Sequence, residues 1–167
     1  MAFKMATGTA SPGDFNRSGH RHLVSAGVGI AWAARRELLD RHGFYDTCIV
    51  GGGDRAFVCA AYGRFDDVVQ AHSMSARRAE HYRRWARPVY EDIRGDVGFV
   101  DTDVMHLWHG DLANRQVNER HRRLAEFDFD PERDVAASES GCWRWSTDKP
   151  EMHAYLRAYF AARREDG

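Results

Sequence analysis

Apolar side chains recur three or four residues apart along much of the chain, the spacing that gathers them on one face of a helix. The stretch 75–94 carries four of them: Tyr82, Trp85, Val89 and Ile93. Pro88 either kinks this predicted helix or starts its second half. The stretch 149–164 predicts a closing helix whose aromatic stripe packs in the core. Shorter helices are expected over 36–42, ended by Gly43, over 54–62, ended by Gly63, and over 114–127.

Apolar runs alternate with these helices and predict buried strands over 28–34 and 47–50. The segment 95–108 is also β-like, because it contains the apolar runs 97–100 and 104–108. Trp143 and Trp145 alternate with polar residues, as in a short strand. The order of elements is therefore α/β, with a small mixed sheet, flanking helices and a helix-rich C-terminal part.

The first 26 residues are rich in Gly, Ser, Thr and Ala and show no periodicity. We expect an irregular or disordered lead-in over 1–26 and one folded domain over 27–167.

Composition and net charge limit the kinds of binding partner and the cellular location that we expect. The chain has 167 residues, of which 43% are hydrophobic, and its net charge of −1 leaves no basic excess to hold a nucleic acid. No apolar stretch approaches the ~20 residues of a membrane span, and no signal sequence is evident. The three cysteines lack metal or redox spacing and indicate a reducing compartment, so a cytoplasmic location is expected.

Arginines gather in two places, between 77 and 87 and between 120 and 123. Such clusters are either solvated helix faces or a site for a polyanionic ligand such as a diphosphate.

A run of glycines, Gly51, Gly52 and Gly53, precedes Asp54 at the start of a predicted helix. Glycines permit backbone conformations and close approaches that side chains would block. Asp54 therefore either caps the helix or lies in a cleft as a general base. No phosphate-loop pattern is present.

His106, Trp108 and His109 stand together where an apolar run ends. The histidines are either packed against the tryptophan or placed to reach a metal or a phosphate. Asp101-Thr102-Asp103, just before them, has the spacing of a carboxylate pair that holds a divalent ion.

Several of these segments together resemble one family. The segments 29–36 (GIAWAARR), 43–46 (GFYD), 51–54 (GGGD) and 106–110 (HLWHG) follow in the order of the galactosyltransferase-like, acceptor-side C-terminal region of a GT-A-fold glycosyltransferase. The later segments resemble the tail of bacterial and phage proteins of this type: 114–115, 128–131, 143–145 and 149–151. The resemblance thus extends over nearly all of 27–167.

The resemblance implies a partial GT-A fold and a metal-dependent transfer of a hexose from a nucleoside-diphosphate sugar to a hydroxyl acceptor. Asp54 matches the general base. His109 matches the ligand of a divalent ion, Mn²⁺ or Mg²⁺, and His106 is a weaker ligand candidate. The acceptor would bind near Gly52 and Gly53. Trp32 and Trp108 either offer it a stacking face or are buried tryptophans of the core.

The chain also departs from this family. A complete enzyme begins with a nucleotide-binding half that ends in DxD, whereas here Asp101-Thr102-Asp103 follows the GGGD element. We therefore expect the isolated chain to be weakly active or inactive unless a separate polypeptide supplies the donor-binding half. The alternative is a non-catalytic carbohydrate-binding or interaction module. A small metal-dependent hydrolase built on His106, His109 and Asp54 is a third, less favoured reading.

Overall fold

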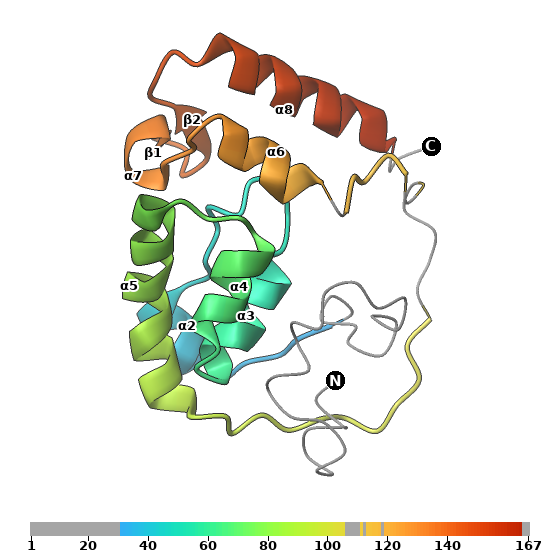
Figure 1. Ribbon diagram of the computed structural model, residues 1–167. Coiled ribbons are helices and arrows are strands. Elements are labelled where there is room, and N and C mark those ends of the chain that lie inside the picture. The colour runs from blue at the N-terminus through green and yellow to red at the C-terminus, as the bar shows by residue number, and fades with distance from the viewer. Residues whose placement is uncertain (1–30, 106–110, 112, 118, 165–167) are drawn as a thin grey trace. The chain divides into compact units, whose positions relative to one another are not determined.

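The computed structural model describes residues 31–105, 111, 113–117 and 119–164 (Figure 1). Helices predominate in this part of the chain, and the one sheet within it has two antiparallel strands. The class is therefore α/β in the broad sense. The elements are α2 (Arg36–His42), α3 (Gly53–Ala61), α4 (Phe65–Ala71), α5 (Ala76–Ile93), α6 (Arg120–Glu126), α7 (Pro131–Asp134), β1 (Val135–Ala137), β2 (Trp143–Trp145) and α8 (Pro150–Arg163).

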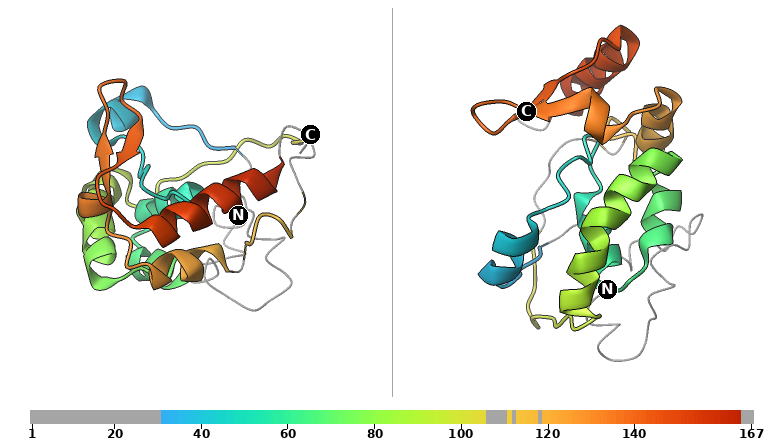
Figure 2. Two further views of the ribbon diagram at one scale, coloured as in Figure 1. Left: turned by 90° about the horizontal axis from the view of Figure 1, so that it is seen from above. Right: turned by 90° about the vertical axis from the view of Figure 1, so that its left-hand side faces the viewer.

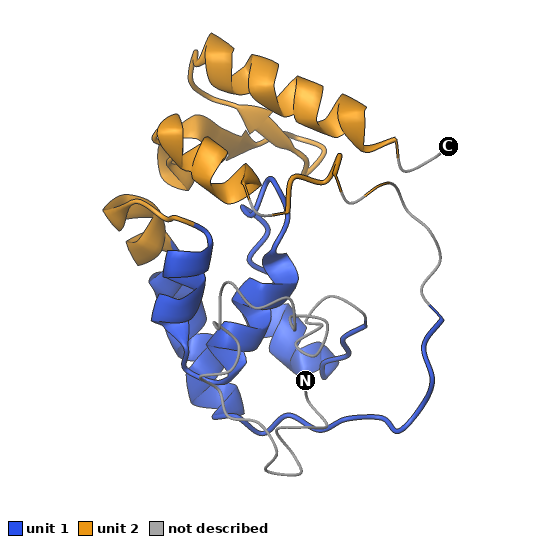
Figure 3. Cartoon of the chain, turned by 45° about the vertical axis from the view of Figure 1, so that its right-hand side comes forward, with its two compact units in different colours: residues 1–72, 82–106 blue, residues 73–81, 107–167 orange. Residues whose placement is uncertain are grey.

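Two compact units make up the chain (Figure 3). Unit 1 consists of residues 1–72 and 82–106, and unit 2 of residues 73–81 and 107–167. Helix α5 is continuous and belongs to both, because its residues up to His81 fall in unit 2 and the rest in unit 1. Pro88 lies inside this single helix. The predicted lead-in over 1–26 lies outside the described residues, so the division at residue 27 stays a prediction.

In unit 1, the C-terminal part of α5 runs alongside α3 (Figures 1 and 2). Tyr82 is fully buried between them, and its hydroxyl donates to the Ala56 carbonyl oxygen at 2.8 Å. The rings of Tyr45 and Trp85 lie 5.1 and 6.1 Å from the Tyr82 ring. These aromatic contacts form the core of the unit.

Helix α2 ends as predicted at Gly43, whose φ of 61° is in the left-handed region that glycine adopts at low cost. The Trp85 indole N–H donates to the carbonyl oxygen of His42 at 2.9 Å and so satisfies one of the terminal carbonyls of α2. Asp92 of α5 accepts from Arg41 at 2.6 Å and contacts the His42 ring nitrogen at 2.7 Å. These contacts fix α2 on the C-terminal part of α5.

Unit 2 is organised around a buried carboxylate, Asp134. It accepts from the Lys149 ammonium at 2.8 Å, the Thr147 hydroxyl at 2.6 Å and the Asp130 backbone N–H at 2.8 Å. Asp130 in turn caps α7 by accepting from the Glu132 N–H. The carboxylate therefore joins α7 to the segment that leads into α8.

The small sheet and the last helix complete unit 2. Val135 pairs with Trp145 and Ala137 with Trp143, so the predicted strand at Trp143–Trp145 is confirmed. The predicted helix over 149–164 is α8, which buries Met152, Leu156 and Tyr159, whereas Phe160 at the edge of the stripe is 48% exposed.

Three predicted strands are wrong where the structure describes them. Residues 31–34 and 95–105 contain no strand, and 47–50 lie in turns. The run 47–50 is apolar because Thr47, Cys48 and Val50 are buried in a turn, not because it pairs in a sheet. Residues 28–30 and 106–108 lie outside the described residues. The predicted helix over 114–127 begins only at Arg120, and α4 is an element that the sequence did not predict.

None of the helices in the described part of the chain is both long and apolar enough to cross a membrane.

The three cysteines are free thiols and differ sharply in exposure. Cys48 and Cys59 are buried, and burial, the largest influence, raises the pKa of Cys59 to about 12. Cys142 is exposed. Because the thiolate is the reactive form, we expect iodoacetamide at pH 8 to add one group per native chain, at Cys142, and to react with all three thiols only in denaturant. Mass spectrometry counts the adducts; rapid native labelling of Cys59 would contradict the buried position.

Candidate functional site

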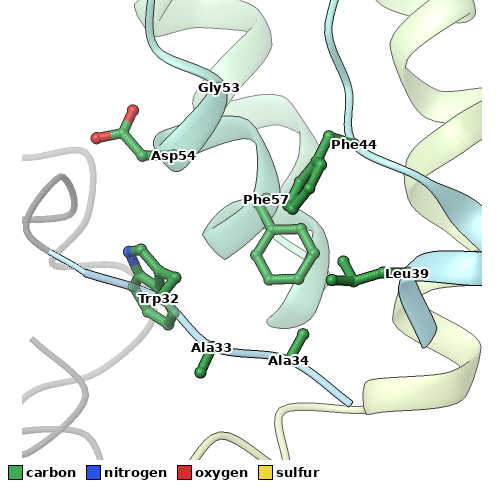
Figure 4. Close-up of a pocket in the computed structure, with 8 residues that line it drawn as sticks. All are labelled: Trp32, Ala33, Ala34, Leu39, Phe44, Gly53, Asp54 and Phe57. Carbon is green, nitrogen blue, oxygen red and sulfur yellow. The ribbon is translucent and has the colours of Figure 1, made fainter. Parts of the chain in front are cut away.

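A pocket of about 200 Å³ opens in unit 1 where three segments converge (Figure 4). The segment before α2, helix α2 with the turn after it, and the first residues of α3 form its wall. Its lining residues are Trp32, Ala33, Ala34, Leu39, Phe44, Gly53, Asp54 and Phe57. Most of the described wall is thus apolar, and among its described residues Asp54 alone has a charged side chain.

The glycine run leads into the helix whose first residues line this pocket. Gly51 and Gly52 have φ values of 93° and 89°, which side-chain-bearing residues rarely adopt. The Gly51 N–H donates to the Cys48 carbonyl oxygen at 2.8 Å, and the Gly52 carbonyl oxygen accepts from the Ala56 N–H at 3.0 Å. The chain therefore reverses tightly and enters α3 at once.

Asp54 is in the first turn of α3, one residue after the helix begins. The capping residue is Gly52, and no side chain caps this end, so the alternative in which Asp54 is the cap is wrong. A carboxylate in the first turn is favoured by the partial positive charge of the helix N-terminus. Among the described residues, Asp54 has no hydrogen-bond or ion-pair partner, which leaves its oxygens available to a ligand.

Three aromatic side chains line the pocket together with Asp54. Figure 4 shows the Phe57 ring between Trp32 and Leu39, with Phe44 above it, and the Asp54 carboxylate above Trp32, directed away from the Phe44 and Phe57 rings. The Phe44 and Phe57 ring centroids are 6.3 Å apart, and Phe57 lies 6.4 Å from Trp85. Phe44 is 65% exposed and Trp32 37% exposed, so both can be covered further by a ligand.

The structure brings three of the predicted site residues together: Trp32, Gly53 and Asp54. Gly52 adjoins them as the helix cap but does not line the pocket. His106, Trp108 and His109 lie outside the described residues. Sequence reasoning did not single out Leu39, Ala33, Ala34, Phe44 or Phe57 as site residues. Phe44 belongs to the GFYD segment, and Ala33 and Ala34 belong to the GIAWAARR segment.

A metal centre is not formed by the residues that the structure describes. Within them, no group of three or more His, Cys, Asp or Glu side chains is close enough to hold an ion. Asp101 and Asp103 are exposed in the segment after α5. Mn²⁺ or Mg²⁺ at His109 and His106 therefore stays a prediction.

The arginines between 77 and 87 do not form one anion site. Arg77 lies 3.6 Å from the Asp130 carboxylate, and Arg78 is buried with its guanidinium 5.6 Å from the centre of the Phe129 ring. Arg83 pairs with Asp66 at 2.7 Å. These contacts lie within each unit. Because Arg78 is buried, the cluster is not simply a solvated helix face either.

Comparison of the chain with protein-family models, with curated proteins and with solved structures finds no significant match.

Proposed function

We propose that the unit 1 pocket binds the hydroxyl acceptor of a hexosyl transfer and that Asp54 is the general base. The observation that supports this most is the meeting of Trp32, Gly53 and Asp54 in one pocket, although Trp32 is distant from the other two in sequence. The GT-A resemblance assigns acceptor binding and base catalysis to the same residues.

The chemistry of the pocket suits a sugar. The C–H face of a pyranose packs on an aromatic ring, and its hydroxyls hydrogen-bond to a carboxylate. Trp32, Phe44 and Phe57 offer such rings, and Asp54 offers the carboxylate. A pocket with apolar walls and one polar group placed to fix orientation is typical of small-molecule sites.

In the proposed reaction, Asp54 accepts the proton of the acceptor hydroxyl as the oxygen attacks the anomeric carbon of the donor. The new glycosidic bond forms, the bond to the donor phosphate breaks, and its electron pair leaves with the nucleoside diphosphate. A divalent ion at His109 and His106 would offset charge on the leaving group, but no step assigned to Asp54 depends on it.

A donor-binding half is the second requirement of this proposal. The segment after α5 carries four large apolar side chains that are 43–89% exposed: Phe99, Val100, Val104 and Met105. They form two pairs, separated by the exposed polar residues 101–103. Exposed apolar surface marks places that bind another part of a protein. We propose that this segment receives the donor-binding half, carried by a separate polypeptide, and that turnover by the present chain alone is slow.

The test is release of nucleoside diphosphate from a panel of nucleotide sugars, with Mn²⁺ and a mixture of saccharide acceptors, over long incubations. We expect slow, acceptor-dependent release that Asp54→Asn lowers at least 100-fold, since a positioned base contributes about 10²–10⁴ in rate. The matched control is Asp66→Asn, in the first turn of α4, whose side chain is 86% exposed. Equal rates for Asp54→Asn and the unaltered chain would contradict the role of Asp54.

Binding without turnover is the alternative function, a carbohydrate-binding module, which the aromatic lining also favours. Saturation-transfer NMR with the same saccharides separates the two. Both predict that Trp32→Ala weakens saccharide binding at least tenfold, but only the transferase releases nucleoside diphosphate. If no saccharide binds and no diphosphate is released, both proposals are wrong.

A further inference from the structure

Three arginines of unit 2 converge on two tyrosines of α8. Arg120 and Arg163 both donate to the Tyr159 hydroxyl oxygen, at 3.3 and 3.5 Å. The Arg163 guanidinium also lies 5.7 Å from the centre of the Tyr159 ring, and that of Arg123 lies 6.0 Å from the Tyr155 ring. We call these five residues the Arg–Tyr cluster.

The cluster is extended because its two rings belong to successive turns of α8. Tyr155 and Tyr159 stack with centroids 6.3 Å apart and planes inclined by 27°. Arg120 and Arg123, three residues apart on α6, share one face of that helix. One end of the array thus carries Arg120 and Arg163, and the other carries Arg123.

The position of Arg120 in α6 is unfavourable for a positive charge. It is the first residue of α6, where positive charge is disfavoured by the helix dipole. Its Nε is buried and has no hydrogen-bond partner among the described residues. No carboxylate of the described chain pairs with it either. A neutral phenol oxygen is therefore its one partner in this part of the chain.

An acidic side chain pairs with an arginine of the cluster. Glu126 pairs with Arg123 at 2.6 Å and with Arg122 at 3.3 Å, and both pairs are exposed. Burial, followed by the charge of Tyr159, raises the pKa of Tyr155. Exposed ion pairs contribute little stability, so a phosphoryl oxygen can displace Glu126 from Arg123.

We propose that the Arg–Tyr cluster binds a diphosphate group. Guanidinium groups recognise phosphoryl oxygens through paired N–H donors. Arg120 and Arg163 reach the same oxygen atom already, so both can contact one phosphoryl group, while Arg123 contacts the next. The bound phosphoryl oxygens neutralise the positive charge at the start of α6. This proposal does not rest on glycosyl transfer, because none of its residues lines the unit 1 pocket.

The experiment is calorimetric titration of the full chain with diphosphate, and with inorganic phosphate, at low salt. We expect diphosphate to bind at least ten times more tightly than phosphate. Arg120→Gln should raise the Kd for diphosphate at least tenfold. The matched control is Arg122→Gln, in the same helix, whose side chain is 62% exposed and does not contact the tyrosines; its Kd should change less than twofold.

A second measurement uses the unaltered chain, so its result does not depend on whether the substituted chains fold. In a spectrum of arginine Nε–H groups, diphosphate should shift the signals of Arg120 and Arg163 and leave that of Arg122 in place. Equal losses of diphosphate affinity for Arg120→Gln and Arg122→Gln would mean that net charge alone attracts the ligand, and would contradict a specific site at the Arg–Tyr cluster. So would the absence of any Nε–H shift, or equal affinity for phosphate and diphosphate.

Discussion

Replacing Tyr82 by alanine should lower the free energy of unfolding of unit 1 by about 3–5 kcal/mol, the usual cost of removing a buried aromatic side chain. Tyr82 is fully buried, and its ring contacts Tyr45, Phe65 and Trp85. The substitution leaves a cavity among three rings that cannot all move inward. Denaturant unfolding followed by circular dichroism and tryptophan fluorescence measures the loss.

Tyr82→Phe is the matched control because it removes only the hydroxyl that donates to the Ala56 carbonyl oxygen at 2.8 Å. That hydrogen bond contributes about 1 kcal/mol, so Tyr82→Phe should be much the milder change. Similar losses for the two variants would show that the hydroxyl, not the ring, dominates this part of the core.

Replacing Asp134 by alanine should destabilise unit 2 by about 3 kcal/mol, because the change leaves polar groups without the carboxylate that pairs with them. The Thr147 hydroxyl and the Asp130 N–H lose their acceptor. Lys149 keeps its contacts to the carbonyl oxygens of Phe127 and Asp128, at 3.1 and 2.8 Å, but loses its counter-charge. Chemical denaturation at pH 7 measures the effect.

The loss of stability caused by Asp134→Ala should become smaller as the pH falls. Burial by itself would raise the pKa of Asp134, but hydrogen bonds from Lys149, Thr147 and the Asp130 N–H outweigh it, so the folded-state pKa is lowered. The stabilisation is therefore fully present above the unfolded-state pKa of about 4, and is lost as pH falls through the lower folded-state value. Asp134→Ala and the unaltered chain should converge in stability at strongly acidic pH.

Asp148→Ala is the control for this prediction. Asp148 lies between Thr147 and Lys149 in sequence, yet it is exposed. Its removal should change stability by less than about 0.5 kcal/mol, as is usual for surface positions. A loss for Asp148→Ala as large as that for Asp134→Ala would mean that net charge, and not the buried network, stabilises unit 2.

Helices were more predictable here than strands, and the reason lies in particular residues. The helices at α2, α3, α5 and α8 follow from apolar spacing, with Gly43 marking one end. The segment 97–105 is as apolar as a strand, but Val100 and Met105 are 83% and 89% exposed. A strand needs a neighbouring strand whose backbone hydrogen-bonds with its own. A short apolar run does not show whether the fold provides such a neighbour. Helix α4 was missed because in its seven residues only Val68 is buried.

The candidate site was predictable only in pieces. Local chemistry pointed to Asp54 after its glycines, and the family resemblance pointed to Trp32. That these two meet depends on how the segment before α2 lies against the start of α3, which no local pattern encodes. Phe44 and Phe57 complete the wall because their rings pack together across the turn between α2 and α3.

The division of α5 has a consequence for any attempt to dissect the chain. Residues 73–81 belong to unit 2 although unit 1 precedes and follows them, so the two units are interleaved along the sequence. No single cut separates the two units: a fragment that ends at residue 106 holds all of unit 1 but also residues 73–81 of unit 2, which include the first residues of α5, and a fragment that starts at 107 lacks them. Unit 1 and its pocket can therefore be moved into another protein as one segment only together with this piece of unit 2.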